Sequence, residues 1–201
     1  MRLGVIGGSF DPVHLGHLGV AEAAREEFEL DRVVFVPAAQ PPHKGGVALA
    51  PAADRLEMVK LAVAANPHFL ASDVELQRKG PSYTIDTLTE ISTLYPVARL
   101  FFIVGADSLS ELHQWHRARE LVERFDFIIV GRPGVEALQF ERLVAAFGAA
   151  AAERLRLGYL SREPYNISAT DIRARVAAGK SIRYLVTPAV ERYIFKRGLY
   201  T

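Results

Sequence analysis

The chain has 201 residues, a length that fits one domain or a domain with a small appendage. Half of its residues are hydrophobic, and 24 Lys and Arg against 23 Asp and Glu give a net charge of +1. Because its positive and negative charges nearly cancel, the chain has no overall electrostatic field that attracts a nucleic-acid backbone, so we expect no nucleic-acid partner. It contains no cysteine, which excludes disulfides, thiolate zinc sites and a cysteine nucleophile.

A membrane partner is not expected either. No run approaches the roughly 18 apolar residues that suggest a membrane span. The apolar start of the chain stops at Gly7 and Gly8, and Asp11 follows, so it indicates a buried strand rather than a signal peptide. Together with the absence of disulfides, this predicts a soluble, cytoplasmic protein. The oligomeric state stays open, a homo-oligomer included.

Short apolar runs alternate with amphipathic segments along most of the chain. The runs typical of buried parallel strands are Leu3–Ile6, Arg32–Val36, Leu100–Val104 and Phe127–Val130, with weaker candidates at Phe69–Ser72 and Leu155–Leu160. Helices are predicted over Leu15–Phe28, Ala53–Ala65, Thr84–Leu94, Leu112–Arg124 and Glu136–Phe147. This alternation favours an α/β fold, a doubly wound, Rossmann-like parallel sheet with helices on both faces.

The pattern changes near the end of the chain. Ser168, with an acid three residues later, has the form of a capping box and predicts a helix to about Ala178. A threonine followed by a first-turn proline predicts a second helix over Ala189–Lys196. We therefore expect one domain over residues 1–201, with an α/β core to about residue 160 and a small C-terminal helical subdomain at about 161–201.

The longest segment without a regular pattern is Pro37–Ala52, which is rich in proline and glycine. Loops of this length are often lids or binding loops. Lys44 in this loop is either a solvated surface lysine or a mobile cation that can swing over a triphosphate. We expect the loop to be mobile when empty and to order over bound nucleotide.

The strongest chemical signal is Gly7–His17, directly after the first predicted strand. Ligands of open α/β sheets bind outside the carboxyl ends of the strands, and glycines let backbone N–H groups approach a phosphate. His14 and His17 lie three apart at a helix start, so both rings can face one side, and Gly16 leaves the helix surface between them bare. Simple packing of the two histidines is one alternative. A zinc site is another, although Asp11 is the nearest acid and no cysteine exists.

Further positions suit phosphates or rings. Ser168 begins a helix whose free N–H groups favour phosphate, and Arg173 lies about one turn inside it. The alternatives are that Ser168 is only a helix cap and that Arg173 is only a solvated surface charge. Asp107 follows Gly105 at the end of a strong strand, so it lies at the ligand edge or caps the next helix. Trp115 has polar neighbours, which favours stacking at a site wall over core packing.

Five separated motifs resemble those of the bacterial nicotinate-nucleotide adenylyltransferases, within the nucleotidyltransferase superfamily that carries His-x-Gly-His. In chain order they are Gly7–His17, Pro41–Lys44, Ser82–Thr87, Gly105–Asp107 with Trp115 downstream, and Ile167–Arg173. They follow the family's order over nearly the whole chain. Ser9 stands where many members carry threonine, which keeps the hydroxyl. His116 stands where several relatives carry tyrosine, so a backbone contact survives there but a side-chain contact is in doubt.

The resemblance implies adenylyl transfer from ATP to nicotinate mononucleotide, giving nicotinate adenine dinucleotide and pyrophosphate, a step of NAD biosynthesis. His17 would stabilise the α-phosphate in the transition state, while His14 and Arg173 would hold the β- and γ-phosphates. Mg²⁺ would come bound with ATP, without a dedicated protein metal site. The resemblance implies further ATP contacts from Gly7, Gly8, Ser9, Phe10, Gly105, Asp107, Ile167 and Ser168.

For the acceptor nucleotide, the resemblance implies contacts from Lys44, Thr84, Trp115 and His116. Trp115 would stack on the pyridine ring, and the nicotinate carboxylate would meet the Thr84 hydroxyl and the backbone N–H of His116. Such fixed donors favour a carboxylate over the amide of nicotinamide mononucleotide.

Other functions stay open to different degrees. The chain lacks a Gly-x-x-x-x-Gly-Lys phosphate loop, a Gly-x-Gly-x-x-Gly fingerprint and a Gly-x-Ser-x-Gly elbow, which argues against P-loop, dehydrogenase and serine-hydrolase chemistry. Another adenylyltransferase of the superfamily, acting on phosphopantetheine or nicotinamide mononucleotide, is the nearest alternative. A fragment resembling class I aminoacyl-tRNA synthetases and a nucleotide-sensing module without turnover are the others.

Overall fold

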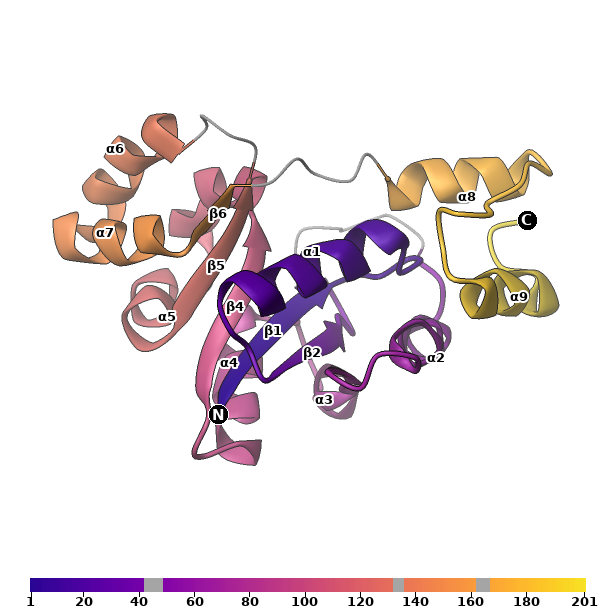
Figure 1. Cartoon of the computed structure of the whole chain (residues 1–201), viewed down its shortest axis with the longest axis horizontal. Coiled ribbons are helices and arrows are strands. Elements are labelled where there is room, and N and C mark those ends of the chain that lie inside the picture. Colours follow the sequence, from indigo (N-terminus) through magenta and orange to yellow (C-terminus); the bar gives the residue numbers. More distant parts are fainter. Residues whose placement is uncertain (42–48, 132–135, 162–166) are drawn as a thin grey trace.

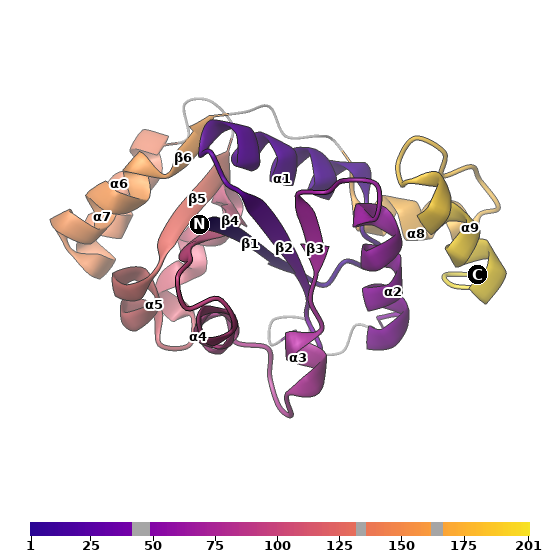
Figure 2. The same ribbon diagram turned by 60° about the horizontal axis from the view of Figure 1, so that its bottom comes forward.

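A computed structural model describes residues 1–41, 49–131, 136–161 and 167–201. Within these ranges, six parallel strands form one sheet in the order β3-β2-β1-β4-β5-β6 (Figures 1 and 2). The sheet grows outward from β1 in both directions, so the strand order reverses between β1 and β4. This confirms the predicted doubly wound α/β fold. The strands are β1 (Arg2–Gly8), β2 (Arg32–Pro37), β3 (Phe69–Ala71), β4 (Arg99–Gly105), β5 (Asp126–Gly131) and β6 (Tyr159–Ser161).

Helices cover both faces of the sheet (Figure 2). One face packs against α1 (Leu15–Glu27), α2 (Ala52–Val63), α8 (Ala169–Ala177) and α9 (Pro188–Arg197). The other face packs against α3 (Val74–Gln77), α4 (Thr84–Leu94), the 3₁₀ helix η1 (Ala106–Gln114), α5 (Ala118–Arg124), α6 (Glu136–Phe147) and α7 (Ala149–Leu157). Each connection between neighbouring parallel strands therefore carries at least one helix, as parallel pairing requires.

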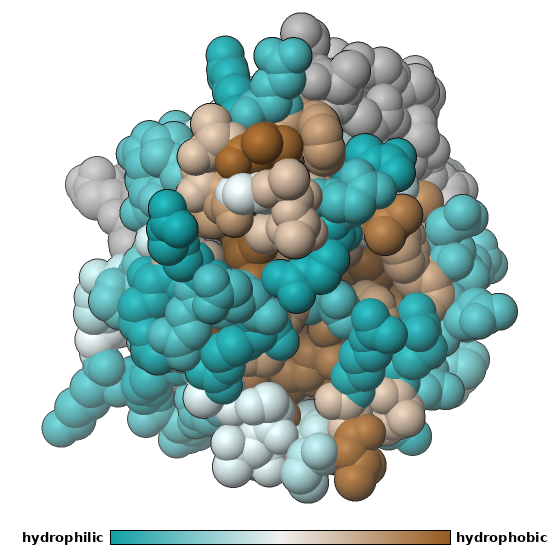
Figure 3. Space-filling model, turned by 90° about the vertical axis from the view of Figure 1, so that its left-hand side faces the viewer, coloured by the Kyte–Doolittle hydropathy of each residue, from teal (hydrophilic) through white to brown (hydrophobic). Residues whose placement is uncertain are grey.

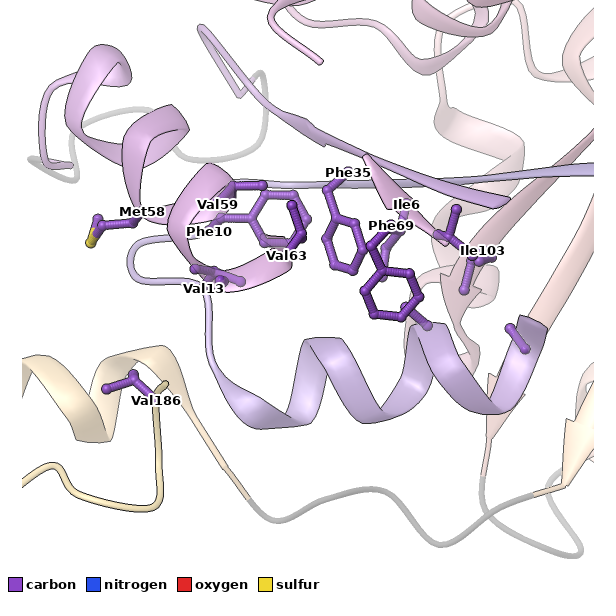
Figure 4. Packing of buried hydrophobic residues seen from close by; sticks show 14 of the residues in the cluster. Ile6, Phe10, Val13, Phe35, Met58, Val59, Val63, Phe69, Ile103 and Val186 are labelled. Atoms are coloured by element: carbon purple, nitrogen blue, oxygen red, sulfur yellow. The ribbon is translucent and has the colours of Figure 1, made fainter. Parts of the chain in front are cut away.

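Alternation along the strands produces two separate cores. In β1, Leu3 and Val5 point to the core beneath α4, whereas Ile6 points to the core beneath α1. In the core beneath α1, the ring centroids of Phe35 and Phe69 lie 5.2 Å apart, between the sheet and α1 (Figure 4). Strands buried on both faces explain why their sequences are continuous apolar runs.

The two C-terminal helices share the core beneath α1. Ile172 of α8 and Val190 and Ile194 of α9 are buried in it, and the Leu15 N–H donates to the Leu185 oxygen at 2.9 Å. The Thr187 side chain accepts a bond from the Val190 N–H at 3.4 Å, which confirms the predicted start of α9.

At the start of α8 the prediction holds in part. Ser168 occupies the N-cap position, but its side chain makes no capping hydrogen bond. The predicted helix therefore forms, and the predicted capping box does not.

The predicted helix over Leu112–Arg124 is wrong. The chain forms η1 to Gln114, leaves helical geometry at Trp115, and starts α5 only at Ala118. Arg117 has a φ of 52°, in the left-handed region, which interrupts any continuous right-handed helix. The break brings the side chains of the turn to the edge of the sheet.

The predicted strand over Leu155–Leu160 is also wrong. Its first half, Leu155–Leu157, belongs to α7, which begins after Gly148, and only Tyr159 onward forms β6. A Cβ atom on Gly158 would lie 1.9 Å from the Phe127 oxygen, so the tight passage from helix to strand requires glycine. The alanine-rich stretch before it is a good helix former, which the apolar pattern alone obscured.

At the end of the molecule that holds α6 and α7, most outward side chains are hydrophilic, and apolar ones lie recessed between them (Figure 3). None of the helices in the described ranges combines the length and the apolar character needed to cross a membrane.

Candidate active site

A pocket of about 920 Å³ lies at the carboxyl ends of β1 and β4, where the strand order reverses. This is the position at which open α/β sheets bind ligands. The volume is large for one small molecule and lies near the upper end of ordinary ligand pockets. Its wall combines the end of β1, the start of α1, the end of β4, the start of α4 and the turn after η1.

The first half of the pocket is the glycine–histidine segment. It contains Gly7, Gly8, Ser9, His14 and His17. A Cβ atom on Gly7 would lie 3.8 Å from the Phe102 ring, which itself lines the pocket, so the missing side chain keeps this space open. The N-terminus of α1 also lies on this side. The Leu15 and His17 N–H groups donate to the Leu185 and His14 oxygens at 2.9 and 3.0 Å, so it is chiefly the positive end of the helix dipole that favours an anion here. We name this segment the donor half.

The two histidines of the donor half stack on each other. Their ring centroids are 3.6 Å apart with an interplanar angle of 24°. Gly16 lies between them in the sequence, is buried, and also lines the pocket. The prediction that both rings face one side is confirmed.

A hydrogen bond fixes which nitrogen of His17 carries the proton. The backbone N–H of His14 donates to Nδ1 of His17 at 3.2 Å. An accepting Nδ1 leaves the proton of a neutral imidazole on Nε2. Phe10 packs edge-on against the same ring, with the centroids 5.0 Å apart. His17 therefore has a set orientation and an N–H donor on its other nitrogen.

His14 is buried, with 8% of its surface exposed. Burial lowers the pKa of His14 from 6.5 to about 4, so the ring is neutral at pH 7. Its Nδ1 is buried without a hydrogen-bond partner among the described residues. Within the described part of the chain, the pocket wall contains neither lysine nor arginine. The wall therefore offers neutral donors, such as the histidine rings and the Ser9 hydroxyl, in place of charged ones.

Several expected ATP contacts lie outside this wall. Phe10 is 1% exposed and belongs to the core beneath α1, where it supports His17. Ile167 packs against the same core, and Ser168 is exposed. Arg173 lies beside the loop after β1, where its Nη1 donates to the Asp11 oxygen at 2.7 Å. Lys44, which was expected to contact the acceptor nucleotide, lies outside the described residues.

The second half of the pocket is formed by Thr84, Trp115 and His116, and we name it the acceptor half. Thr84 is the first residue of α4, and the other two belong to the turn between η1 and α5. The structure brings together these three predicted residues, although Thr84 lies 31 positions before Trp115 in the sequence.

Two contacts fasten the turn to α4. Tyr83 and His116 stack with centroids 4.2 Å apart at 24°. Nη1 of Arg117 lies 3.3 Å from Oδ1 of Asp86 in the first turn of α4. Tyr83 lies within the predicted Ser82–Thr87 motif, but neither it nor Arg117 was predicted as a site residue, because each acts only across a turn that was predicted to be helix.

Trp115 joins the wall to the core. Its ring packs edge-on against Phe102 with centroids 6.1 Å apart and an angle of 73°, and the residue is half-buried. Gly105 and Asp107, both exposed, line the pocket at the end of β4. The side chain of Trp115 therefore both packs against the core and forms part of the pocket wall.

Glu75 is a lining residue that the sequence did not reveal. It is 6% exposed, and its Oε1 accepts a bond from the Thr87 hydroxyl at 2.6 Å. This bond ties α3 to α4 behind Thr84. The four-residue α3 has no periodic pattern long enough to predict it.

The described residues include no group of three or more histidines, aspartates and glutamates that could hold a metal ion. In that part of the chain, the carboxylates of the pocket wall are Asp107 and Glu75. The arrangement offers N–H donors on one side and an aromatic wall with a hydroxyl on the other. It suits two ligands that meet end to end, one of them rich in phosphate.

The chain is similar to known proteins over most of its length. The model of the cytidylyltransferase-like family matches residues 5–175. A probable nicotinate-nucleotide adenylyltransferase of Desulfitobacterium hafniense is 47% identical, over 99% of this chain and 95% of the relative. One of Thermus thermophilus is 46% identical, over the full length of both chains.

Solved structures share the fold at low identity. The nicotinic acid mononucleotide adenylyltransferase of Plasmodium falciparum in complex with NaAD superposes with a TM-score of 0.74 at 19% identity, over 99% of this chain and 97% of the other. A putative nicotinate-nucleotide adenylyltransferase of Vibrio parahaemolyticus gives 0.69 at 21%, over 100% and 96%. By its sequence relatives and its matching family model, the chain belongs to the nicotinate-nucleotide adenylyltransferase family of cytidylyltransferase-like proteins.

Proposed function

We propose that the protein transfers the adenylyl group of ATP to nicotinate mononucleotide, releasing pyrophosphate and forming nicotinate adenine dinucleotide, a step of NAD biosynthesis. One observation carries the proposal: the stacked histidine pair at the start of α1 and the Thr84–Trp115–His116 cluster line the same pocket. The family to which the chain belongs supports it, since its relatives carry the name of this activity.

The donor half binds ATP. The 5′-phosphate oxygen of the mononucleotide attacks the α-phosphorus in line, the bond to the pyrophosphate oxygen breaks, and no covalent intermediate forms. Nε2–H of His17 donates to the α-phosphate and stabilises its developing negative charge. Gly7, Gly8, Ser9 and His14 line the path of the phosphates.

Arg173 completes the phosphate site from behind the loop. Its Nη1 lies 3.8 Å from Oδ2 of Asp11, and its side chain is 24% exposed. A guanidinium so placed needs only to rotate toward the opening to meet the β- and γ-phosphates, which it binds in a bidentate manner. Arg173 belongs to α8, and the N-terminus of this helix, which follows Ile167 and Ser168, adds a favourable dipole. Gly105 and Asp107 at the end of β4 border the remainder of the nucleotide.

The residues present fit a Mg²⁺ ion that arrives bound to ATP. A wall without lysine or arginine in the described part of the chain leaves phosphate charge to be neutralised. Mg²⁺ keeps several waters and is often held by phosphates with few carboxylates, so the lack of a three-ligand cluster among the described residues is compatible with it. Bound there, the ion supplies charge neutralisation to the triphosphate and its leaving group.

The acceptor half binds nicotinate mononucleotide. Trp115 offers its ring for stacking on the pyridine, and the Thr84 hydroxyl with the backbone N–H of His116 meets the ring carboxylate. The amide of nicotinamide mononucleotide would direct its NH₂ group at these donors. A mismatch of this kind costs about 1–3 kcal/mol, so we expect the acid to be preferred roughly ten- to a hundredfold.

Product analysis tests the proposal. The purified protein is mixed with ATP, Mg²⁺ and nicotinate mononucleotide, and chromatography is combined with a pyrophosphate assay. We expect one pyrophosphate for each nicotinate adenine dinucleotide formed. Parallel reactions replace the acceptor with phosphopantetheine or nicotinamide mononucleotide. Turnover only with phosphopantetheine would assign another adenylyltransferase activity, and ATP binding without turnover on any acceptor would indicate a nucleotide sensor.

A further inference from the structure

Asp11 lies in the loop between β1 and α1, three positions before His14. It is 1% exposed and is not among the residues of the pocket wall. A fully buried carboxylate is costly unless hydrogen bonds compensate for its lost hydration. Its partners therefore show what holds this loop.

Three separate segments contact Asp11. Its Oδ1 accepts bonds from the Tyr200 hydroxyl at 2.7 Å and from the Ala50 N–H at 3.2 Å. Its backbone oxygen accepts the 2.7 Å bond from Arg173. The segment before α2, helix α8 and the turn after α9 thus meet at one residue of the histidine loop.

Arg55 holds the neighbouring backbone. Its guanidinium is 2% exposed and donates to the oxygens of Ser9 at 2.8 Å, Ala38 at 2.7 Å and Ala50 at 2.9 Å. Ser9 and Ala38 line the pocket. The loops that follow β1 and β2 are therefore fixed to the same segment whose Ala50 N–H reaches Asp11.

Tyr200 is the member of this network that lies farthest from the pocket in sequence. Burial, and then its bond to Asp11, raise the pKa of the Tyr200 hydroxyl far above its ordinary value, so it stays a donor at any physiological pH. Its ring packs against the core beneath α1. Tyr200 therefore brings both a packed ring and a charge-assisted hydrogen bond to the loop.

The same C-terminal segment has a second, separate anchor. The Tyr193 hydroxyl donates to Oδ1 of Asp54 on α2 at 2.7 Å, and Arg197 donates to the same oxygen at 3.0 Å. This anchor attaches α9 to α2 without touching the histidine loop. The attachment of α9 and the contact to Asp11 can thus be altered independently.

We propose that Tyr200 is a positioning residue for the triphosphate site. By holding Asp11, it fixes the histidine loop and the residue on which Arg173 rests, and through them the binding of the β- and γ-phosphates. The proposal rests on the proposed function, in which these residues bind ATP.

Two matched variants test it. Tyr200→Phe and Tyr193→Phe each remove one hydroxyl that donates to a buried carboxylate at 2.7 Å, and both keep the ring. We expect similar losses of melting temperature in the two variants. Only Tyr200→Phe should raise the KM for ATP, roughly three- to tenfold, as expected when one hydrogen bond to a charged group is partly transmitted to the site. Its kcat should fall less than its KM rises, and the KM for nicotinate mononucleotide should stay near the wild-type value.

A second measurement needs no turnover. The rise in melting temperature with added ATP and Mg²⁺ reports nucleotide binding alone. Tyr200→Phe should require about the same three- to tenfold more ATP for a given rise, and Tyr193→Phe should match the wild type. Equal behaviour of the two variants, or an unchanged response of Tyr200→Phe, would overturn the positioning role. If the wild type binds ATP but forms no dinucleotide, the proposed function fails, while the melting experiment still decides the role of Tyr200.

Discussion

The donor half and the acceptor half of the pocket are built in different ways. The donor half is nearly continuous in sequence, running from the end of β1 through the loop into the first turn of α1. Its histidines contact each other through the 3.2 Å bond and the 3.6 Å stacking, and the loop before them is also held by distant residues such as Tyr200. The acceptor half joins the first residue of α4 to a turn after η1, and long-range contacts such as Tyr83 on His116 hold the two together.

This difference suggests a division of labour. A donor half whose lining residues come mainly from one continuous segment suits a task that every adenylyl transfer shares, the binding and activation of a triphosphate. An acceptor half assembled from separate segments can change with the acceptor without disturbing the phosphates. We expect variants of the donor half to lower turnover with any acceptor, and variants of the acceptor half to change which acceptor is used.

The largest effect is expected in the donor half, from His17→Ala. Loss of one preorganised donor to the transition state should reduce kcat by about 10²–10³-fold. Stopped assays of pyrophosphate release measure it. His68→Ala, which removes an exposed histidine bonded to the Asp31 oxygen at 3.2 Å, is the control and should turn over like the wild type. Wild-type kcat in His17→Ala would show that another group activates the α-phosphate.

The donor half should also be sensitive to acid through His14. Its pKa is 6.5 in the unfolded chain and about 4 in the folded protein. Between these values the unfolded state binds the extra proton, so stability is full above the upper value and falls as the pH drops toward the lower one. From pH 7.5 to pH 4.5 the loss due to His14 is roughly 2–3 kcal/mol.

Urea unfolding at the two pH values measures this effect. Carboxylates such as Asp54, whose pKa is lowered by its bond to Tyr193, add their own acid sensitivity. The comparison is therefore made between the wild type and His14→Gln, in which the drop in unfolding free energy should be smaller by that amount. Identical drops would mean that the ring of His14 is solvated in the folded protein.

The smallest effect is expected from removing the contact that holds the turn of the acceptor half to α4. Arg117→Gln removes the 3.3 Å contact to Asp86 and the 2.7 Å contact to Glu120. Half-exposed ion pairs are worth about 0.2–1 kcal/mol, so the KM for nicotinate mononucleotide should rise by at most about fivefold while the KM for ATP stays unchanged. Arg124→Gln loses a 2.7 Å pair to the same Glu120 without touching α4, and it should behave like the wild type. Similar KM values for nicotinate mononucleotide in both variants would show that the Asp86 contact does not hold the acceptor half in place.

The fold and the donor half could largely be predicted from the sequence. Apolar runs at the four strong strands and the glycine–histidine motif are local signals, and the helix that starts beside His14 follows them directly. The family resemblance identified Thr84, Trp115 and His116, which the structure places in one pocket.

What the sequence did not predict depends on tertiary contacts. The break between η1 and α5 follows from a left-handed residue, Arg117, which a helical pattern of apolar positions hides. Glu75 enters the wall from a four-residue helix. Asp11 is bonded to Tyr200 across 189 positions, and no local pattern can indicate such a contact.

The division between the two halves is tested most directly by the ratio of kcat/KM for nicotinate mononucleotide to that for nicotinamide mononucleotide. It is measured in the wild type, His17→Ala, Thr84→Val and the control Thr89→Val, whose hydroxyl bonds to the Ile85 oxygen at 2.8 Å. We predict that His17→Ala lowers both efficiencies and leaves the ratio unchanged. Thr84→Val should lower the ratio about tenfold, the value of one hydrogen bond to a carboxylate, and Thr89→Val should not change it. An unchanged ratio in Thr84→Val, or a large change in His17→Ala, would contradict the separation of donor and acceptor roles.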